Sequence, residues 1–396
     1  MTVQSRVQLD ELDQIGQIRA LDDATAIALQ ASGLVDVRPE RDGRWRIAAR
    51  GRVGSVVVGE LDVMVSSKAS PASLLFYLAY AKDPGFRPEE VSAHAGDDLW
   101  ATVAETLIRT CEQAMRGGVL QGYRTEDDSL HVVRGRIRVS DQLARRPGIP
   151  LPLEVRFDEY TVDIAENQII RAAIRQMLRV PRLRDQARRR LSHLDGRLDG
   201  VTPAVIRRRR PTWLPTRLNR RYAPALRVAE VVLDNQSSIA GSGRATLAAF
   251  VVNMATVFED FVSTAIREAF RGQGTTRAQY KVHLGEGSKV PMKPDVVQLR
   301  GNQPVAVFDA KYKLEDPKGG YPNADVYQML AYCTALQLPT GWLVYAVGDA
   351  GKEPIRVAHT DVQVFQYALD LRDHPVAVLA QIRELVSSAI GTALPK

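Results

Sequence analysis

The feature that most constrains this chain is an apolar strand that ends in two opposite charges. The stretch VAVFDAKYK covers residues 305–313. Side chains alternate between the two faces of a strand, so Asp309 and Lys311 share one face with two valines. A carboxylate and an ammonium at the end of a buried strand cost free energy unless they pair or bind something. The strand therefore ends either in a structural ion pair or in a functional site.

A second carboxylate lies within reach of this pair. Asp295 follows Pro294, fourteen residues before Asp309, and a short hairpin closes that distance. Carboxylate oxygens suit Mg²⁺, with Mn²⁺ as the alternative, and such a metal keeps positions open for water and substrate phosphate. The metal activates water, while Lys311 can orient the nucleophile or neutralise charge in the transition state. The set predicts metal-dependent phosphodiester hydrolysis.

Three further polar side chains flank these strands in the sequence. Glu259 lies on the predicted helix before them, and Gln328 and Tyr332 lie on the predicted helix after them. Gln328 and Tyr332 are four residues apart and therefore share one helix face. An isolated Asp-x-Lys triplet is usually a strand-end ion pair, so this surrounding set is what favours the interpretation as a site.

Apolar periodicity predicts the elements of the C-terminal part of the chain. In chain order they are a helix over residues 244–271, strands over 280–284, 293–299 and 305–312, a helix over 322–336 and a strand over 342–347. Glu259 lies at the edge of the apolar stripe of the first helix. The succession indicates an α/β domain over residues 236–396.

The rest of the chain is expected to form two further regions. Residues 1–118 should form an N-terminal α+β domain, with a helix over 6–32, strands over 45–49 and 53–66, and helices over 72–82 and 99–115. Residues 119–235 should form a middle region of short strands up to residue 139, followed mostly by helices over 166–179 and 183–194. In the strands, Arg134, Arg136 and Arg138 alternate and should lie on one face.

The middle region is exceptionally rich in arginine. Residues 131–230 hold 23 arginines, no lysine and 10 acidic residues, within a chain of net charge +7. A solvated charged face is one interpretation, and a phosphate-contacting surface is the other, because guanidinium groups fork onto phosphate oxygens. The residues predicted to contact DNA are Arg207, Arg208, Arg209, Arg210, Arg220 and Arg221.

Several classes of protein and site are excluded. The chain has 2 cysteines and 6 histidines, none at metal-ligand spacing, so a disulfide framework and a Cys- or His-based metal site are ruled out. No apolar run approaches the ~18 residues of a membrane helix, and the N-terminus lacks a signal core. We therefore expect a cytoplasmic protein whose chemistry depends on carboxylates, lysine and arginine.

Here the sequence resembles a known family. Glu259, Pro294-Asp295, Asp309-Ala310-Lys311 and Gln328-x-x-x-Tyr332 resemble the PD-(D/E)xK nuclease fold, in its RecB-like branch. More narrowly, FEDFV, PDVVQL, VFDAKYK and DVYQMLAYC resemble the C-terminal domain of the McrC family. McrC is the nuclease subunit of McrBC modification-dependent (type IV) restriction systems. The upstream stretches GRIRVSDQL, FDEYTVDIAENQIIRAAI, NRRYAPAL and VGSVVVGELDVMVSSK are similar to the preceding parts of that family.

The resemblance implies a fold and a function. The C-terminal domain would be a mixed sheet flanked by helices, acting as a Mg²⁺-dependent DNA endonuclease in phage defence. It would cut when assembled with a GTP-hydrolysing AAA+ partner resembling McrB, which reads 5-methylcytosine in double-stranded DNA. The N-terminal region would bind that partner and stimulate its GTPase. The chain has no G-x-x-x-x-G-K-[ST] phosphate-binding loop, so GTP would be bound by the partner.

The resemblance also assigns roles to individual residues. Six positions would form the active site: Glu259, Asp295, Asp309, Lys311, Gln328 and Tyr332. Both aspartates and the glutamate would hold the metal, the lysine would act in catalysis, and the last two residues would orient phosphate. The alternatives are a non-catalytic DNA-binding or ring-organising factor, and a nuclease of the same fold in DNA repair or another phage-defence system. The arginine-rich residues 38–52 either reach into the partner or form a plain basic hairpin.

Overall fold

The structure is a computed structural model. It describes residues 5–91, 98–204, 210–240, 246–312, 323–346 and 353–393. Two compact units are present, the first formed by Met1–Thr102 together with Asn235–Lys396 and the second by Val103–Asp234. The first unit thus joins sequence from both ends of the chain. The division into residues 1–118, 119–235 and 236–396 stays a prediction.

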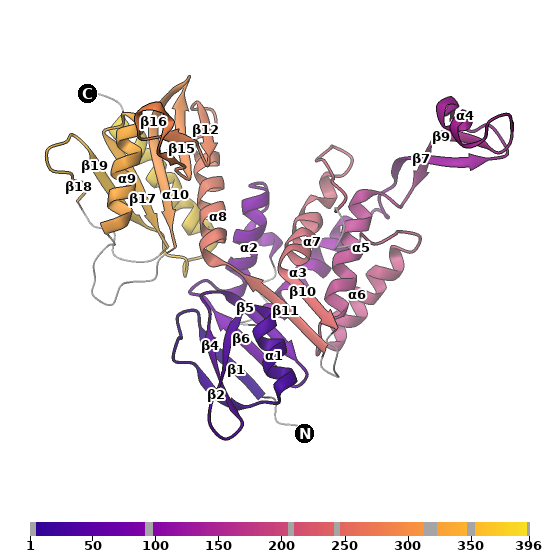
Figure 1. Cartoon of the computed structure of the whole chain (residues 1–396), viewed down its shortest axis with the longest axis horizontal. Coiled ribbons are helices and arrows are strands. Elements are labelled where there is room, and N and C mark those ends of the chain that lie inside the picture. The colour runs from indigo at the N-terminus through magenta and orange to yellow at the C-terminus, as the bar shows by residue number, and fades with distance from the viewer. Residues whose placement is uncertain are drawn as a thin grey trace. The chain divides into compact units, whose positions relative to one another are not determined.

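A five-stranded sheet in the first unit joins distant parts of the sequence. Its order is β1 (Ser5–Asp10), β6 (Leu61–Ser66), β5 (Val53–Val58), β11 (Thr246–Val252) and β10 (Gln236–Ala240) (Figure 1). β1 and β6 are parallel and the other pairs are antiparallel. At Gly54 of β5 a Cβ would lie 1.9 Å from the carbonyl oxygen of Phe250 in β11. Glycine is therefore required where these two strands meet.

The helix predicted over residues 244–271 is wrong in its first part. The chain forms β11 up to Val252 and then α8 over Met254–Ala269. Asn253 caps the helix, because its side chain accepts a hydrogen bond from the Ala255 N–H. The apolar stretch before it is buried as a strand against β5, and apolar content alone does not separate a buried strand from a helix.

The helix predicted over residues 6–32 is also wrong in its first half. β1 alternates, with Val7 and Leu9 buried between exposed neighbours. Only α1 (Asp23–Ser32) is helical, capped by Asp22 and ended by Gly33 at φ 73. A second sheet has the order β2 (Gln17–Ala20), β4 (Arg44–Ala49) and β3 (Val35–Pro39). The predicted strands over 45–49 and 53–66 are confirmed as β4, β5 and β6.

Two predicted helices of the N-terminal part are confirmed. They are α2 (Pro71–Lys82) and α3 (Leu99–Ala114), and the short 3-10 helix η1 (Pro88–Glu90) lies between them. α2 is buried over most of its length and packs against α8. Phe76, Tyr77 and Tyr80 of α2 surround Phe261 of α8, with ring centroids 4.5–6.3 Å apart. This aromatic cluster fixes α8, the helix that carries Glu259.

The six-stranded sheet of the C-terminal part carries the predicted site. Its order is β12 (Thr275–Ala278), β15 (Val296–Arg300), β16 (Gln303–Lys311), β17 (Thr340–Tyr345), β19 (Gln363–Ala368) and β18 (Ile355–Arg356). β16, β17 and β19 are parallel to one another, and the remaining pairs are antiparallel. Small additional elements are β13 (Val282–His283), η4 (Glu286–Ser288) and β14 (Pro291–Met292).

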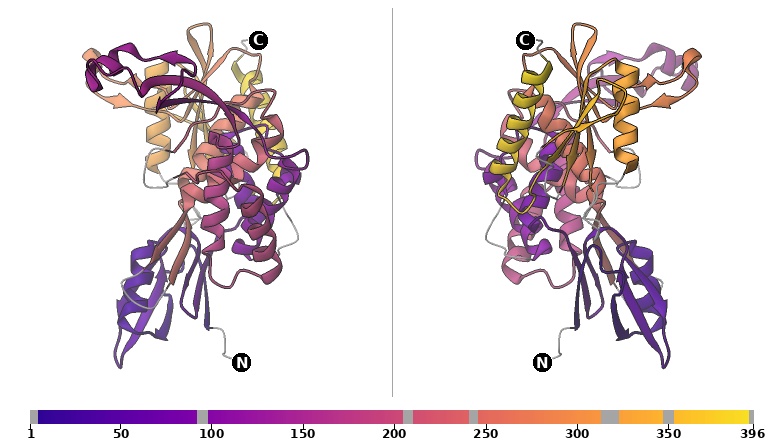
Figure 2. Two further views of the ribbon diagram at one scale, coloured as in Figure 1. Left: turned by 90° about the vertical axis from the view of Figure 1, so that its right-hand side faces the viewer. Right: turned by 90° about the vertical axis from the view of Figure 1, so that its left-hand side faces the viewer.

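Helices cover both faces of this sheet. On one face α9 (Asn323–Leu336) packs Met329 and Cys333 against Val307 and Leu343. α8 contacts β16 and packs against α10 (Pro375–Ala393), which also contacts β16. Figure 2 shows α9 and α10 on opposite sides of the sheet. The fold is thus a mixed α/β arrangement. The sequence predicted the strands and helix up to β17, but not β12, β18, β19 or α10.

The second unit combines helices with a long two-stranded arm. Its helices after α3 are α5 (Ala165–Leu178), α6 (Asp185–Arg197), η3 (Arg220–Tyr222) and α7 (Ala223–Asn235). A three-stranded sheet has the order β7 (Gly122–Leu130), β9 (Leu153–Thr161) and β8 (Arg136–Ile137), with α4 (Val139–Arg145) between β8 and β9. The β7–β9 pair extends away from the helices of its unit and carries α4 at its far end (Figure 1). We call residues 122–161 the arm.

The predicted row of three arginines is wrong. β8 holds only Arg136 and Ile137. Arg134 lies outside the strand with its guanidinium 3.9 Å from the ring centroid of Phe157. Arg138 forms ion pairs with Asp127 and Asp141. These guanidinium groups therefore serve the arm itself.

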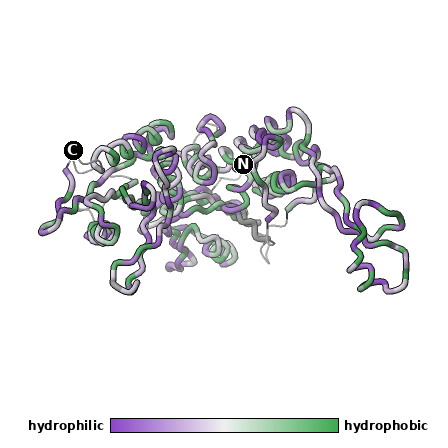
Figure 3. Tube along the Cα trace, turned by 90° about the horizontal axis from the view of Figure 1, so that it is seen from above, coloured by the Kyte–Doolittle hydropathy of each residue, from purple (hydrophilic) through white to green (hydrophobic). Residues whose placement is uncertain are grey.

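The far end of the arm exposes apolar side chains. Residues that are 47–67% exposed are Val132, Val133, Val139, Leu143, Ile149 and Leu151. Figure 3 shows hydrophobic segments recurring at this end. Exposed apolar side chains gathered on one small element suggest a contact with another molecule. Among the described residues, no helix has the length and apolar character needed to cross a membrane.

Candidate active site

The β15–β16 hairpin brings the two predicted aspartates together. The strands are antiparallel, with Val296 opposite Phe308, so Asp295 lies beside the end of β16. The Ala310 N–H donates a 2.9 Å hydrogen bond to Oδ2 of Asp295. Asp295 is 8% exposed and Asp309 is 2% exposed. Two buried carboxylates thus meet at the point where β16 ends.

Lys311 lies against Asp309. Its ammonium nitrogen is 2.5 Å from Oδ2 of Asp309, and the lysine side chain is 19% exposed. The ammonium neutralises this buried oxygen, and its contact opposes the effect of burial on the pKa of Asp309. The structural ion pair considered as the alternative is therefore present.

The carboxylates of the site disfavour one another's charge. Burial, and then the charge of Asp295, raise the pKa of Asp309 to about 6. Burial and the same neighbour raise the pKa of Glu259 on α8 to about 7. Such shifts follow when like charges share a site with little water. A divalent cation would remove this cost, and perturbed carboxylates are typical of functional sites.

Gln279 is a residue of this site that the sequence did not reveal. Its Nε2 donates hydrogen bonds to Oε1 of Glu259 at 2.5 Å and to Oδ1 of Asp295 at 2.9 Å. Gln279 follows β12 in the left-handed region, at φ 50. No motif marks this position, because its role depends on β12 pairing with β15.

The α9 residues lie along the same site. Gln328 is exposed and its Nε2 donates a 2.6 Å hydrogen bond to the Tyr332 hydroxyl. Burial, and then the Asp309 carboxylate, raise the pKa of Tyr332 to about 12, so its hydroxyl stays protonated. Asp325 is 4% exposed, accepts a 3.3 Å hydrogen bond from Tyr345, and its charge contributes to the raised pKa of Asp309.

Asp325 is a second residue of this site that lies outside the six predicted positions. It precedes Gln328 by three positions and Tyr332 by seven. Residues with these spacings lie on one helix face, which is the signal that could have found it. The side chain is a carboxylate beside the metal ligands expected from the sequence.

The donor set fits a hard divalent cation in kind. It offers the carboxylate oxygens of Glu259, Asp295 and Asp309, of which both aspartates are buried. In the described ranges, however, no group of three or more His, Cys, Asp or Glu side chains is arranged to hold a metal ion. The amide nitrogen of Gln279 instead contacts one oxygen each of Glu259 and Asp295. Metal binding by these residues therefore requires the Gln279 side chain to move.

The predicted DNA-contacting arginines fall into two groups. Arg207, Arg208 and Arg209 lie outside the described residues. The structure describes the other three arginines. Arg210 forms an ion pair with Asp234, and Arg221 donates a 3.1 Å hydrogen bond to the Gly118 carbonyl. Arg220 is exposed. Arg210 and Arg221 are thus partly engaged within their own unit.

Other arginines of the second unit hold its elements together. Arg190 of α6 forms ion pairs with Glu105 and Glu112 of α3, at 2.6 and 2.8 Å. Arg171 and Arg175 of α5 form ion pairs with Asp195 of α6 at 3.1 and 2.9 Å. These three arginines therefore stabilise the packing of helices.

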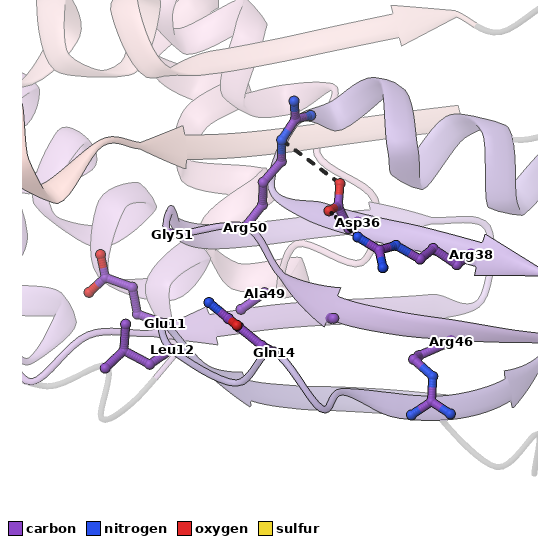
Figure 4. A pocket seen from close by; sticks show the side chains of 10 residues that line it. Glu11, Leu12, Gln14, Asp36, Arg38, Arg46, Ala49, Arg50 and Gly51 are labelled. Carbon is purple, nitrogen blue, oxygen red and sulfur yellow. Dashed lines mark ion pairs between the residues drawn. The ribbon is translucent and has the colours of Figure 1, made fainter. Parts of the chain in front are cut away.

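The N-terminal part contains a cavity of about 500 Å³ among its small strands. Ten residues line it: Glu11, Leu12, Gln14, Asp36, Arg38, Arg46, Ala48, Ala49, Arg50 and Gly51. The guanidinium groups of Arg46 and Arg50 point in different directions (Figure 4). Arg38 and Arg50 both form ion pairs with Asp36, at 3.6 and 3.9 Å. The Asp36 carboxylate thus occupies the point that Arg38 and Arg50 face, and Arg46 pairs with Glu40.

Comparison with known proteins places these features in context. The family model described as "McrBC 5-methylcytosine restriction system component" matches residues 47–346. A solved structure shares the fold: one chain of the refined half-complex from the tetradecameric assembly of Thermococcus gammatolerans McrB AAA+ hexamers with bound McrC. Its TM-score is 0.60 and its sequence identity is 17%. The match covers 97% of this chain and 100% of that chain. A cryo-EM structure of the Thermococcus gammatolerans McrBC complex matches at TM-score 0.41 and 18% identity, over 69% of this chain and 90% of that chain. No curated protein matches the sequence.

Proposed function

The chain belongs to the family of McrBC 5-methylcytosine restriction system components, and we propose that it is the subunit of such a system that cuts DNA. The observation that carries this proposal is the convergence of Asp295, Asp309 and Lys311 where β16 ends. Ala310 N–H orients one aspartate, and the lysine ammonium lies 2.5 Å from the other. Together with the order of the surrounding elements, this set supports a PD-(D/E)xK endonuclease domain.

Mg²⁺, when bound, would polarise the scissile phosphate and lower the pKa of a bound water. Asp295, Asp309 and Glu259 would hold it, with Mn²⁺ as a substitute. Lys311 would neutralise charge on the phosphate in the transition state or orient the attacking water. Tyr332, whose hydroxyl stays protonated, would donate a hydrogen bond to a phosphate oxygen, and Gln328 would fix the orientation of that hydroxyl.

We further propose that cleavage requires an AAA+ partner that hydrolyses GTP and recognises 5-methylcytosine in DNA. The support is that McrC is bound to McrB AAA+ hexamers in the structure whose fold this chain shares. The chain also lacks a phosphate-binding loop of its own. Nucleotide binding would therefore belong to the partner, and this chain would stimulate the partner's GTPase.

Two surfaces are available for that partner. The N-terminal part was predicted from sequence, and the far end of the arm exposes apolar side chains. A double change of Val132 and Val133 to Asp on the arm tests the second surface, because two carboxylates would prevent burial of that surface in an interface. We expect loss of complex formation in size-exclusion chromatography. Complex formation at wild-type affinity would leave the N-terminal part as the contact.

The test of the nuclease assignment separates cleavage from partner activation. In the assembled complex, Asp309→Ala should abolish cleavage of methylated plasmid and leave GTPase stimulation at the wild-type rate. A matched pair of variants on α8 makes the test more specific. Glu259→Gln should lose cleavage, while Asp260→Asn, at the neighbouring exposed position, should retain cleavage. Cleavage by Asp309→Ala at the wild-type rate would refute the site.

The alternatives predict other outcomes. A non-catalytic DNA-binding or ring-organising factor would bind no Mg²⁺ at this site, whereas the two buried aspartates beside Lys311 favour catalysis. A nuclease of DNA repair, or of another phage-defence system, would cut with an ATPase partner and without dependence on cytosine methylation. Comparing methylated with unmethylated plasmid, with GTP and with ATP, distinguishes these cases.

A further inference from the structure

Gln279 joins two carboxylates that come from different elements of the candidate site. Glu259 lies on α8 and Asp295 precedes β15. The same amide nitrogen of Gln279 lies 2.5 Å from Oε1 of Glu259 and 2.9 Å from Oδ1 of Asp295. The 2.9 Å distance is that of a hydrogen bond to a carboxylate, and the contact with Glu259 is shorter than an ordinary hydrogen bond. One neutral side chain therefore bridges the pair.

The chemistry of the contact fixes which end of the amide faces the carboxylates. Oε1 of Glu259 and Oδ1 of Asp295 face the amide as acceptors, and the amide nitrogen of glutamine carries two donor hydrogens. The amide oxygen in the same place would repel both groups. Two donors directed at two acceptors satisfy this geometry, so Nε2 is the atom that faces Glu259 and Asp295.

The backbone holds the Gln279 side chain in this position. The Gln279 N–H donates a 2.8 Å hydrogen bond to the Asp295 carbonyl, and the Tyr280 N–H donates a 3.1 Å hydrogen bond to the Pro294 carbonyl. Gln279 adopts φ 50, a conformation that residues other than glycine rarely adopt. The segment after β12 is therefore tied to the start of β15, and the side chain is directed at the carboxylates.

We propose that Gln279 is a positioning residue that bridges Glu259 and Asp295 while the site holds no metal, and that Mg²⁺ takes its place. This inference rests on the proposed nuclease function. A divalent cation and an amide donor stabilise negative charge on the same two carboxyl groups, and both would contact the same two oxygens. The amide must then leave its two acceptors when the metal binds.

This exchange has a thermodynamic consequence that a purely structural glutamine lacks. If the amide contacts only the metal-free site, removing it destabilises the metal-free protein and leaves the metal-bound protein unchanged. By linkage, destabilising the metal-free protein alone makes the free energy of metal binding more favourable by the same amount. Hydrogen bonds to charged groups are worth about 1.5–3 kcal/mol, which corresponds to a Kd for Mg²⁺ lower by about tenfold or more.

The experiment compares wild type, Gln279→Leu and Gln279→Ala as full-length chains. Mg²⁺ affinity is measured by isothermal titration calorimetry, and melting temperatures are measured with EDTA and with saturating Mg²⁺. We expect Gln279→Leu to melt lower in EDTA, to match wild type in Mg²⁺, and to bind Mg²⁺ about tenfold more tightly. In Gln279→Ala water can replace the amide, so the fall in melting temperature in EDTA and the gain in Mg²⁺ affinity should both be smaller.

A control variant and two outcomes make the test decisive. Gln298→Leu removes another buried glutamine, which donates a 2.9 Å hydrogen bond to the Gln273 carbonyl, and should lower stability without changing Mg²⁺ affinity. A tenfold weaker affinity in Gln279→Leu would overturn the inference, because the amide would then be a metal ligand. Unchanged melting in EDTA would also overturn it. Absence of Mg²⁺ binding in wild type would instead overturn the proposed function.

Discussion

The Tyr312 hydroxyl donates a 2.7 Å hydrogen bond to Oε2 of Glu11, a residue distant in sequence at the end of β1. Glu11 is 6% exposed. Tyr312 directly follows Lys311, and its ring centroid lies 6.0 Å from that of Phe258, the residue before Glu259. This hydrogen bond ties the N-terminal sheet to the strand and the helix that carry the candidate site.

Loss of this hydroxyl should destabilise the first unit. Tyr312→Phe leaves the buried Glu11 carboxylate without its hydrogen bond, and burial already raises the pKa of that carboxyl group. We expect the free energy of unfolding in urea to fall by about 1–3 kcal/mol. Glu11→Gln keeps an acceptor for the tyrosine and should cost less. Equal stability of Tyr312→Phe and wild type would mean that the hydrogen bond contributes nothing.

Lys311 should be needed for cleavage independently of its effect on stability. Lys311→Met keeps much of the side-chain length but removes the charge facing buried Asp309, so both cleavage and stability in EDTA should fall. Adding Asp309→Asn removes the isolated negative charge, and the double variant should regain stability while remaining inactive. Cleavage assays on the complex and thermal melts of the chain measure the two effects. Recovery of cleavage in the double variant would contradict a catalytic role.

Glu259 should make the stability of the metal-free chain depend on pH. Its pKa, raised to about 7 from 4.5 by burial and Asp295, means that the folded state holds a proton which the unfolded state has released. Between these values stability falls as pH rises. Glu259→Gln lacks this loss, so its free energy of unfolding relative to wild type should increase from pH 5 to pH 8 in EDTA. Saturating Mg²⁺, which favours the ionised carboxylate, should abolish that increase. If the difference in free energy of unfolding between the variant and wild type did not change with pH in EDTA, the raised pKa of Glu259 would be rejected.

The arginines of the middle region should divide into two experimental classes. If Arg208 and Arg209 contact phosphates, changing both to Ala should reduce the slope of log affinity against log salt by about 0.9 for each phosphate that is no longer neutralised. Arg190, which pairs with Glu105 and Glu112, is the matched control. Arg190→Ala should lower the melting temperature and leave the slope unchanged. Fluorescence anisotropy over a salt series makes this comparison, and an unchanged slope for the double variant would assign its arginines to another role.

Alternating apolar and polar residues, and prolines at the ends of elements, made parts of the fold predictable. The strand containing Asp309 and Lys311 was predicted at residues 305–312 and is β16 at Gln303–Lys311. Pro71 marked the start of α2, which the structure confirms. Such local signals succeed where backbone preference and burial agree. They failed at residues 246–252, where an apolar run suits a helix and a strand equally well.

Some residues of the candidate site could be found from sequence because their chemistry conflicts with their position. Asp309 and Lys311 are charged at the end of an apolar strand, and Asp295 is a hairpin away. Gln279 offered no such conflict, since a polar residue after a strand is ordinary. Its hydrogen bonds to Glu259 and Asp295 exist only because β12 pairs with β15.

The sequence by itself determined the elements whose pattern repeats within a few residues, and the charged groups that an apolar strand cannot bury without a reason. Only the tertiary structure decided that β11 pairs with the N-terminal β5, and that arginines such as Arg171 and Arg190 form ion pairs between helices. The physical reason is that strand pairing and ion pairing join residues far apart in the chain. The partner in each case is selected by the packed fold, and no local pattern encodes it.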